Sequence, residues 1–133
     1  MSSPRYLFVY GTLRKGSGNP HARRLAEHAE WAGPGRMPGR LYRLGRYPGL
    51  KLGRVQVRQE WVAGELYRLP AEPGPLAALL EAMDRYEGGD FERVAAVARR
   101  ADGGRVRAWV YEYSLRISEA WRIGPGNNAT FIT

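Results

Sequence analysis

Turn-forming residues recur along the whole chain and divide it into short segments. The 133 residues include 17 glycines and 9 prolines, which are spread through the sequence rather than gathered in a linker. Because glycine and proline interrupt helices and end strands, such a chain suits many short strands better than a helical bundle. The pattern favours a β-rich, barrel-like fold. The length is that of one domain, which we place at residues 1–133.

Several apolar or alternating runs have the length and pattern of strands. The expected strands cover residues 5–10, 39–44, 54–58, 61–69, 91–99 and 105–113. Asp102-Gly103-Gly104 predicts a hairpin turn between the last two. On the final strand, alternation places Ala108 and Val110 on one face and Trp109 and Tyr111 on the other. We expect loops at 31–35 and 45–49 and a loosely ordered tail over 115–133.

One longer segment, Leu76–Gly88, has the spacing of an amphipathic helix. Its apolar residues stand at i, i+3, i+4 and i+7, namely Leu76, Leu79, Leu80 and Met83. At roughly 100° per residue, Glu87 falls on the same face. Gly88-Gly89 then predicts the end of the helix. We therefore expect Glu87 on the last turn, with its side chain directed toward the interior. A shorter helix is expected over 21–28, capped by Asn19.

A carboxylate on an apolar helix face is costly unless it is paired, hydrogen-bonded or protonated. One interpretation is structural, with Arg93 pairing either Glu87 or Asp84. The other is that Glu87 is a general base whose pKa is tuned toward neutral pH. Asp84 lies nearer the edge of the apolar face, where a salt bridge or a cap is the simpler expectation.

The expected first strand is followed by a glycine-rich loop, Gly11–Gly18. Glycine lets the backbone approach a ligand closely, and successive N–H groups in such a turn can hold an anion. The Gly-Lys-Ser/Thr ending of a nucleotide-binding P-loop is absent.

Composition excludes several classes of function. Without cysteine the chain has no disulfide, no thiolate nucleophile and no cysteine metal site. His21 and His28 are the only histidines, and without supporting carboxylates they make a poor metal site, so we expect no metal. No Gly-x-Ser-x-Gly motif is present, which argues against a serine hydrolase.

The chain carries a formal net charge of +8, from 21 basic and 13 acidic residues. Basic chains are candidates for nucleic-acid binding. Here the basic residues are nearly all arginines, scattered without a basic run or a stacking platform, which argues against a nucleic-acid partner. No apolar run approaches the length of a membrane span, and the first residues do not begin a signal peptide. A soluble cytoplasmic protein without a membrane partner is expected.

Two motifs resemble those of the gamma-glutamylcyclotransferase-like family. Val9–Gly16 resembles its Tyr-Gly-Ser/Thr-Leu loop, and Met83–Gly88 followed by Phe91-Glu92-Arg93 resembles its Leu-Asp-x-x-Glu-Gly segment with a trailing Tyr/Phe-x-Arg. Segments 39–49 and 62–67 also match in order, so the resemblance covers about residues 5–113. It is strongest to small bacterial and plant members and to the gamma-glutamylamine cyclotransferases. Met83 replaces the usual leucine, and a Gly-Asp-Trp-like tail segment has only a loose counterpart at 118–121.

The resemblance implies both a fold and a chemistry. The fold is α+β: a small mixed β-barrel with a few flanking helices and a cavity at one end. The chemistry is intramolecular cyclisation of a gamma-glutamyl amine or peptide, whose α-amine attacks its own γ-carbonyl to give 5-oxoproline and a free amine. This reaction requires neither a cofactor nor a metal.

The same resemblance assigns roles to residues. Glu87 is the general acid/base that takes a proton from the α-ammonium and returns one to the leaving amine. Backbone N–H groups of the loop would hold the substrate carboxylate or the oxyanion. The expected substrate-binding residues are Tyr10, Gly11, Thr12, Leu13 and Tyr111. Two alternatives stay open: a non-catalytic module that binds a small anionic metabolite in the same cavity, and an arginine-rich barrel that binds nucleic acid. The catalytic interpretation requires the fold to bring Glu87 to the 10–13 turn.

Overall fold

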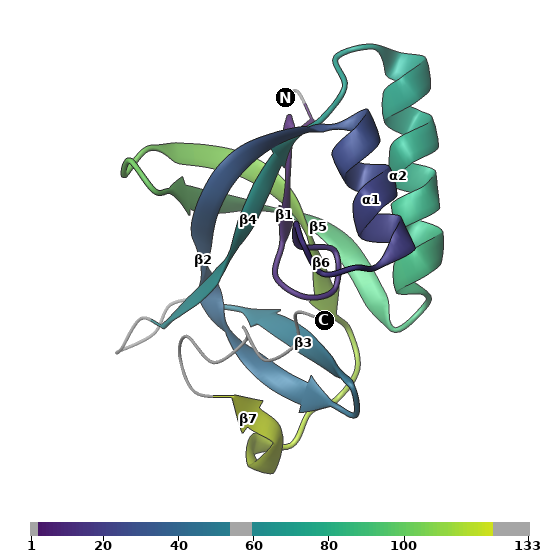
Figure 1. The fold of residues 1–133 in the computed structure, drawn as a ribbon. Helices are drawn as coiled ribbons and strands as arrows, with labels where there is room; N and C mark the ends of the chain where they lie inside the picture. The colour runs from purple at the N-terminus through teal and green to yellow at the C-terminus, as the bar shows by residue number, and fades with distance from the viewer. Residues whose placement is uncertain (1–2, 54–59, 124–133) are drawn as a thin grey trace.

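A computed structural model describes residues 3–53 and 60–123 (Figure 1). Within them the elements follow in the order β1 (Tyr6–Val9), α1 (Pro20–His28), β2 (Glu30–Leu44), β3 (Tyr47–Leu52), β4 (Trp61–Arg68), α2 (Pro73–Glu87), β5 (Phe91–Arg100), β6 (Arg105–Tyr113), a 3₁₀ turn η1 (Glu119–Trp121) and β7 (Arg122–Ile123). The strand expected over 54–58 lies outside the described residues, as does the part of the expected tail from residue 124. The described part of that tail contains η1 and β7, and β7 pairs with β2. None of the described helices is long and apolar enough to span a membrane.

Five strands close into a barrel in the order β1-β4-β2-β5-β6 and back to β1. β1 runs antiparallel to β4 and parallel to β6, where Tyr6 is paired with Ala108. β2 is antiparallel to both β4 and β5. β3 folds back from β2 as a hairpin and pairs with β6 at Leu50. The expected small mixed β-barrel with flanking helices is confirmed.

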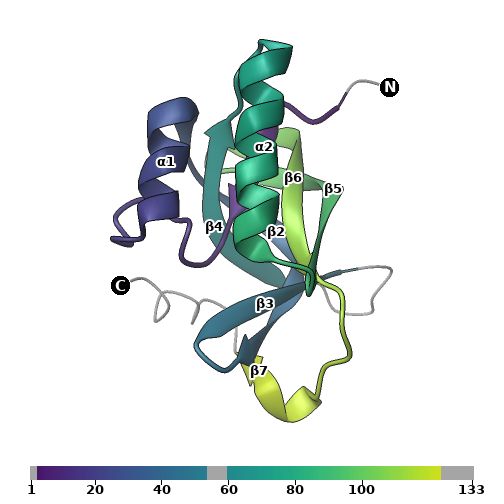
Figure 2. The ribbon, with the colours of Figure 1, turned by 90° about the vertical axis from the view of Figure 1, so that its right-hand side faces the viewer.

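The strands divide the buried residues between two cores, because successive side chains of a strand point to opposite faces. Phe8, Met37 and Val110 belong to the core that fills the barrel. Residues of the other strand face pack under the helices, which lie side by side outside the barrel (Figure 2). This second core contains Leu7, Val9, Leu25, Tyr67, Leu79, Leu80, Met83 and Tyr111. The expected alternation on β6 is confirmed, with Ala108 and Val110 inside and Tyr111 toward the helices.

Both expected helices are present, and each ends where the sequence predicts. The Asn19 side chain accepts a hydrogen bond from the His21 N–H at 2.7 Å and so caps α1. α2 begins at Pro73, a few residues before the expected start, and ends at Glu87. Gly88 follows with φ 81°, and its N–H donates to the Asp84 carbonyl at 3.1 Å. This left-handed position explains the glycine at the end of the helix.

Two segments expected as loops are strands, and in both the expectation was wrong. Residues 31–35 belong to β2, which continues through Gly33 (φ 97°) by shifting its register against β4 between Trp31 and Pro34. A β-bulge of this kind keeps the pairing where the local sequence would break it. The expected loop at 45–49 is a tight turn at Gly45, after which β3 starts at Tyr47. Pro48 is tolerated because β3 meets its second neighbour β6 only at Leu50.

Candidate functional site

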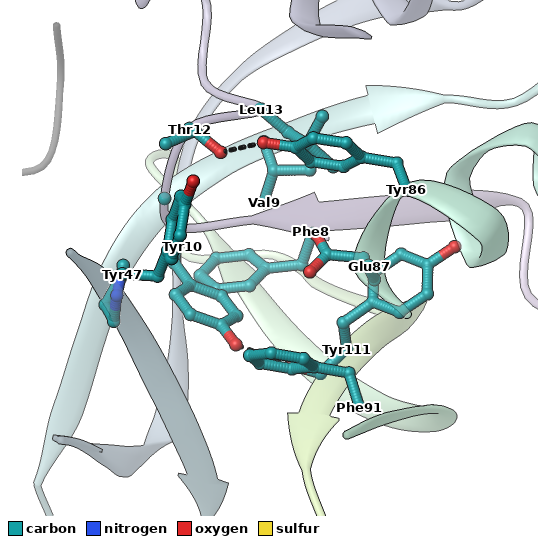
Figure 3. Close-up of a pocket in the computed structure, with 12 residues that line it drawn as sticks. Phe8, Val9, Tyr10, Thr12, Leu13, Tyr47, Tyr86, Glu87, Phe91 and Tyr111 are labelled. Atoms are coloured by element: carbon teal, nitrogen blue, oxygen red, sulfur yellow. Dashed lines mark hydrogen bonds between the residues drawn. The ribbon is translucent and has the colours of Figure 1, made fainter. Parts of the chain in front are cut away.

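A cavity of about 200 Å³ lies between the end of β1 and the end of α2 (Figure 3). This is smaller than the roughly 300–1,000 Å³ of pockets for drug-sized ligands, so it suits a ligand of about amino-acid size. The lining consists of Phe8, Val9, Tyr10, Gly11, Thr12, Leu13, Tyr47, Pro48, Tyr86, Glu87, Phe91 and Tyr111. The structure therefore brings together, in one lining, every site residue expected from the sequence.

Glu87 is the last residue of α2, and its half-buried carboxylate is directed toward the cavity, alongside the rings of Phe8 and Tyr111 (Figure 3). Within residues 3–53 and 60–123 this carboxylate has neither a hydrogen bond nor an ion pair. Burial without a partner disfavours the charged form and raises the pKa of Glu87 from 4.5 to about 7. At neutral pH the group can therefore either accept or donate a proton.

Asp84, one turn earlier on α2, has the opposite environment. Arg93 donates to it through Nε at 2.8 Å and Nη2 at 3.2 Å, and the Tyr111 hydroxyl donates to it at 2.6 Å. Burial acts to raise the pKa of Asp84, but these hydrogen bonds outweigh it and the pKa is lowered. Of the two expected pairings of Arg93, the structure has the one with Asp84.

The glycine-rich loop opposite Glu87 is fixed by its own hydrogen bonds. The Arg14 N–H donates to the Gly11 carbonyl at 3.1 Å, and the Ser17 hydroxyl donates to the Thr12 carbonyl at 2.5 Å. Gly16 and Gly18 have φ of 83° and 82°, a left-handed conformation that glycine adopts without strain. The loop therefore has a defined conformation and forms one wall of the cavity.

This wall offers unused backbone donors. No described residue accepts a hydrogen bond from the N–H groups of Gly11, Thr12 or Leu13. A Cβ at position 11 would lie 3.2 Å from Cγ of Pro48, which also lines the cavity, so glycine avoids a tight contact in this part of the wall. Adjacent N–H groups at the edge of a cavity are suited to bind a carboxylate or an oxyanion.

The two tyrosines expected at the site use their hydroxyls within the protein. The Tyr10 hydroxyl donates to the Tyr111 carbonyl at 2.6 Å and accepts from the Leu50 N–H at 3.2 Å. Burial, with the nearby charge of Glu87, raises the pKa of Tyr10, and burial with the bond to Asp84 raises that of Tyr111. Both phenols therefore stay neutral, and it is their rings that line the cavity.

Sequence reasoning missed half of the lining: Phe8, Val9, Tyr47, Pro48, Tyr86 and Phe91. Of these residues, Tyr86 makes contacts that join the two walls of the cavity. Its hydroxyl lies 2.5 Å from Thr12 Oγ1 and accepts a hydrogen bond from Asn19 Nδ2 at 2.9 Å. Its position directly before Glu87 was the signal that could have identified it. His21 stacks on the Tyr86 ring at 4.2 Å. Among the described residues, no group of three or more histidine and carboxylate side chains is placed to hold a metal ion.

Comparison with solved structures shows the same fold in several proteins. YkqA from Bacillus subtilis is 21% identical with a TM-score of 0.64, over 91% of this chain, and the chain spans 38% of YkqA. An aig2-like protein from Mus musculus is 19% identical with a TM-score of 0.60, over 90% of this chain and 83% of that one. A gamma-glutamyl cyclotransferase is 11% identical with a TM-score of 0.53, over 84% of this chain and 67% of that one.

A comparison with curated proteins gives no match. The family model described as gamma-glutamyl cyclotransferase, AIG2-like, matches residues 7–127. This match covers both walls of the cavity, from the end of β1 to Tyr111. The chain belongs to the gamma-glutamyl cyclotransferase, AIG2-like family.

Proposed function

We propose that the protein is a gamma-glutamyl cyclotransferase, which converts a gamma-glutamyl amine or peptide to 5-oxoproline and releases the amine. One observation carries the proposal: the unpartnered carboxylate of Glu87 and the unused N–H groups of residues 11–13 border the same small cavity. Membership of the family supports the same reaction.

The cavity lining favours a particular orientation of the substrate. No lysine, arginine or histidine of the described chain lines it, so the backbone donors of residues 11–13 are the groups that bind the substrate carboxylate or the oxyanion. The substrate α-ammonium faces Glu87, which is the one acidic side chain among the described residues that line the cavity. The rings of Phe8, Tyr10 and Tyr111 also favour a cation through their π faces.

The reaction then requires only proton transfers and a folded substrate. The α-nitrogen forms a bond to the γ-carbon, and the γ-carbon loses its bond to the amine nitrogen. Over the reaction the α-ammonium gives up two protons and the departing nitrogen receives two. Glu87 accepts a proton from the α-nitrogen and delivers one to the departing nitrogen, a cycle that is most efficient when its pKa lies near the working pH. A small cavity favours this geometry because it holds the attacking nitrogen against the carbonyl.

The experiment compares the wild-type protein with Glu87→Gln on a panel of gamma-glutamyl amines and peptides, with 5-oxoproline as the measured product. Wild type should form product, and Glu87→Gln should lose about 10²–10⁴-fold in kcat/KM, the usual contribution of a general acid/base. Glu81→Gln is the matched control, since Glu81 lies on the same helix but is exposed and pairs with Arg85. Its rate should be unchanged.

Two results would reject parts of the proposal. Equal rates for wild type and Glu87→Gln would remove Glu87 from its role. Absence of product from every substrate, with binding still detectable by calorimetry, would favour the alternative of a non-catalytic binding module.

A further inference from the structure

The ion pair beside the cavity has a place in the proposed reaction. We propose that Asp84 and Arg93 are positioning residues of the cyclotransferase site, which fasten the end of α2 to β5 and β6 and so fix Glu87 and Tyr111 in one cavity. This inference rests on the proposed function. It follows from contacts that join three separate elements at a single carboxylate.

Arg93 and Tyr111 reach Asp84 from two neighbouring strands. They are directly paired in the register of β5 and β6, so their side chains leave the sheet on the same face, beneath α2. Asp84 Oδ1 accepts from both Arg93 Nε and the Tyr111 hydroxyl, and Oδ2 accepts from Arg93 Nη2. The guanidinium of Arg93 also lies 4.4 Å from the centroid of the Trp109 ring, a cation–π contact that further restrains the arginine side chain.

The contacts continue from Asp84 into the cavity in two directions. Along the helix, the Asp84 carbonyl accepts from the Gly88 N–H at 3.1 Å and closes the turn that carries Glu87. Across the sheet, the carbonyl of Tyr111 accepts from the Tyr10 hydroxyl at 2.6 Å. A displacement of Asp84 would therefore move Glu87 and Tyr111 together.

A contribution to folding stability does not by itself explain the ion pair between Asp84 and Arg93. The side chain of Asp84 is 43% exposed and that of Arg93 is 23% exposed, and ion pairs so open to solvent usually add little to the free energy of unfolding. A role in the geometry of the cavity explains why the pair is placed one turn from Glu87.

The pair also balances charge close to Glu87. The segments around Glu87 each contribute a titratable or charged group. These are Asp84 and Tyr86 from α2, Tyr10 directly after β1, Tyr47 from β3, Tyr111 from β6, Arg93 from β5 and, through its stacking on Tyr86, His21 from α1. Asp84 and Arg93 form an ion pair whose opposite charges offset each other, and burial accounts for the raised pKa of Glu87. Removal of either partner would leave the other's charge to act on that carboxylate.

The test is a double-mutant cycle read out by NMR titration. The carboxyl carbon of Glu87 is followed in wild type, Asp84→Asn, Arg93→Gln and the double variant, with its signal identified by its loss in Glu87→Gln. Asp84→Asn leaves a free arginine charge and should lower the midpoint of Glu87. Arg93→Gln leaves a free aspartate charge and should raise it, each by about half a pH unit or more. The double variant should return close to the wild-type midpoint.

Two further variants separate positioning from charge. Tyr111→Phe removes only the hydrogen bond to Asp84, so it should raise KM several-fold and leave the Glu87 midpoint nearly unchanged. Arg93→Lys keeps the positive charge but loses the two-pronged hydrogen bonding to Asp84. It should therefore have the wild-type Glu87 midpoint but a lower rate of 5-oxoproline formation than wild type. The exposed pair Glu81 and Arg85 on the same helix provides the control, and Glu81→Gln should change neither KM nor the Glu87 midpoint.

The titration does not depend on turnover, so the two proposals can fail separately. If Asp84→Asn and Arg93→Gln shift the midpoint in the same direction or leave it unchanged, the positioning inference is wrong even where 5-oxoproline is formed. If the opposite shifts occur but no substrate is cyclised, the pair governs Glu87 and the proposed reaction is wrong. Circular dichroism of each variant excludes misfolded samples from the comparison.

Discussion

Asp84 and Glu87 lie one turn apart on α2, yet their surroundings drive their proton affinities in opposite directions. Hydrogen bonds from Arg93 and Tyr111 hold the pKa of Asp84 below its usual value against the effect of burial. Burial alone raises that of Glu87 to about 7. Two carboxylates whose pKa values are separated in this way can divide the work, one staying charged to hold structure and the other exchanging protons.

The rate of 5-oxoproline formation should follow the ionisation of Glu87. Because the proposed base acts only when deprotonated, kcat/KM should fall about tenfold per pH unit below a midpoint near 7. Initial rates between pH 5 and 8.5 measure this midpoint. A rate that stays constant down to pH 5 would show that no group with a raised pKa limits the reaction.

Glu87→Gln should make the protein more stable at high pH. The folded-state pKa of Glu87 is raised, so the folded protein binds more protons than the unfolded chain between pH 4.5 and about 7, and wild-type stability is lost as the pH rises through this window. The raised pKa of Glu87 corresponds to at most about 3.5 kcal/mol in the free energy of unfolding, at roughly 1.4 kcal/mol per pH unit, and solvent in the cavity reduces this figure.

Urea unfolding of wild type and Glu87→Gln at pH 4 and pH 8 measures this effect. The two proteins should be nearly equal at pH 4, and the variant should be more stable at pH 8. For the control Glu81→Gln, the difference in free energy of unfolding from wild type should be similar at pH 4 and pH 8. A Glu87→Gln variant that is less stable at pH 8 would mean that the carboxylate has a stabilising partner.

The contact between Thr12 and Tyr86 should link the two walls of the cavity energetically. Thr12→Val removes a hydroxyl without changing shape, and Tyr86→Phe removes its partner at 2.5 Å together with the bond from Asn19. Each should cost about 1 kcal/mol in the free energy of unfolding and raise KM, because the 11–13 loop loses a tether.

The double variant should cost clearly less than the sum of the two, since both remove the same bond. Tyr47→Phe is the comparison, because the Tyr47 hydroxyl has no hydrogen-bond partner among the described residues. It should leave stability unchanged. Strict additivity of Thr12→Val and Tyr86→Phe would show that the contact does not couple the walls.

Gly64 should be the glycine least able to accept a side chain. A Cβ there would collide with the Val9 carbonyl oxygen and lie 2.6 Å from Cζ of Phe8, both on β1. Gly64→Ala should therefore cost about 3 kcal/mol by separating β4 from β1. Gly89→Ala, in the exposed turn after α2 with open space around it and no positive φ, should be close to neutral. Thermal unfolding of the two variants makes the comparison, and equal melting temperatures would contradict it.

The parts of the fold that the sequence predicted are those with a strong local period. The face and end of α2 followed from apolar spacing and Gly88, and the two faces of β6 from simple alternation. The position of Glu87 was predictable for the same reason. Its place on the last turn depends only on residues within the same helix.

Strand pairing explains the features of the fold that the local sequence pattern could not predict. Residues 31–35 and 47–49 have the composition of turns, but hydrogen bonding to β4 and β2 keeps them extended. The hydroxyl of Tyr111 meets Asp84 across 27 residues, and Thr12 meets Tyr86 across 74. The sequence around each of these residues contains no signal that identifies its distant partner. In the same way, register places Arg36, Arg99 and Arg105, distributed along the chain, as direct neighbours on three strands.

Closure of the barrel between β1 and β6 has a consequence for when the cavity exists during folding. Tyr6 is paired with Ala108, so the ring is completed by two segments that lie far apart in the sequence. Contacts between such distant segments form slowly, whereas α1 and α2 need only local contacts. A nascent chain that has not yet produced β6 has both helices available but no complete cavity. Recovery of 5-oxoproline formation after dilution from urea should therefore report the pairing of β1 with β6, and should lag behind the return of helical signal.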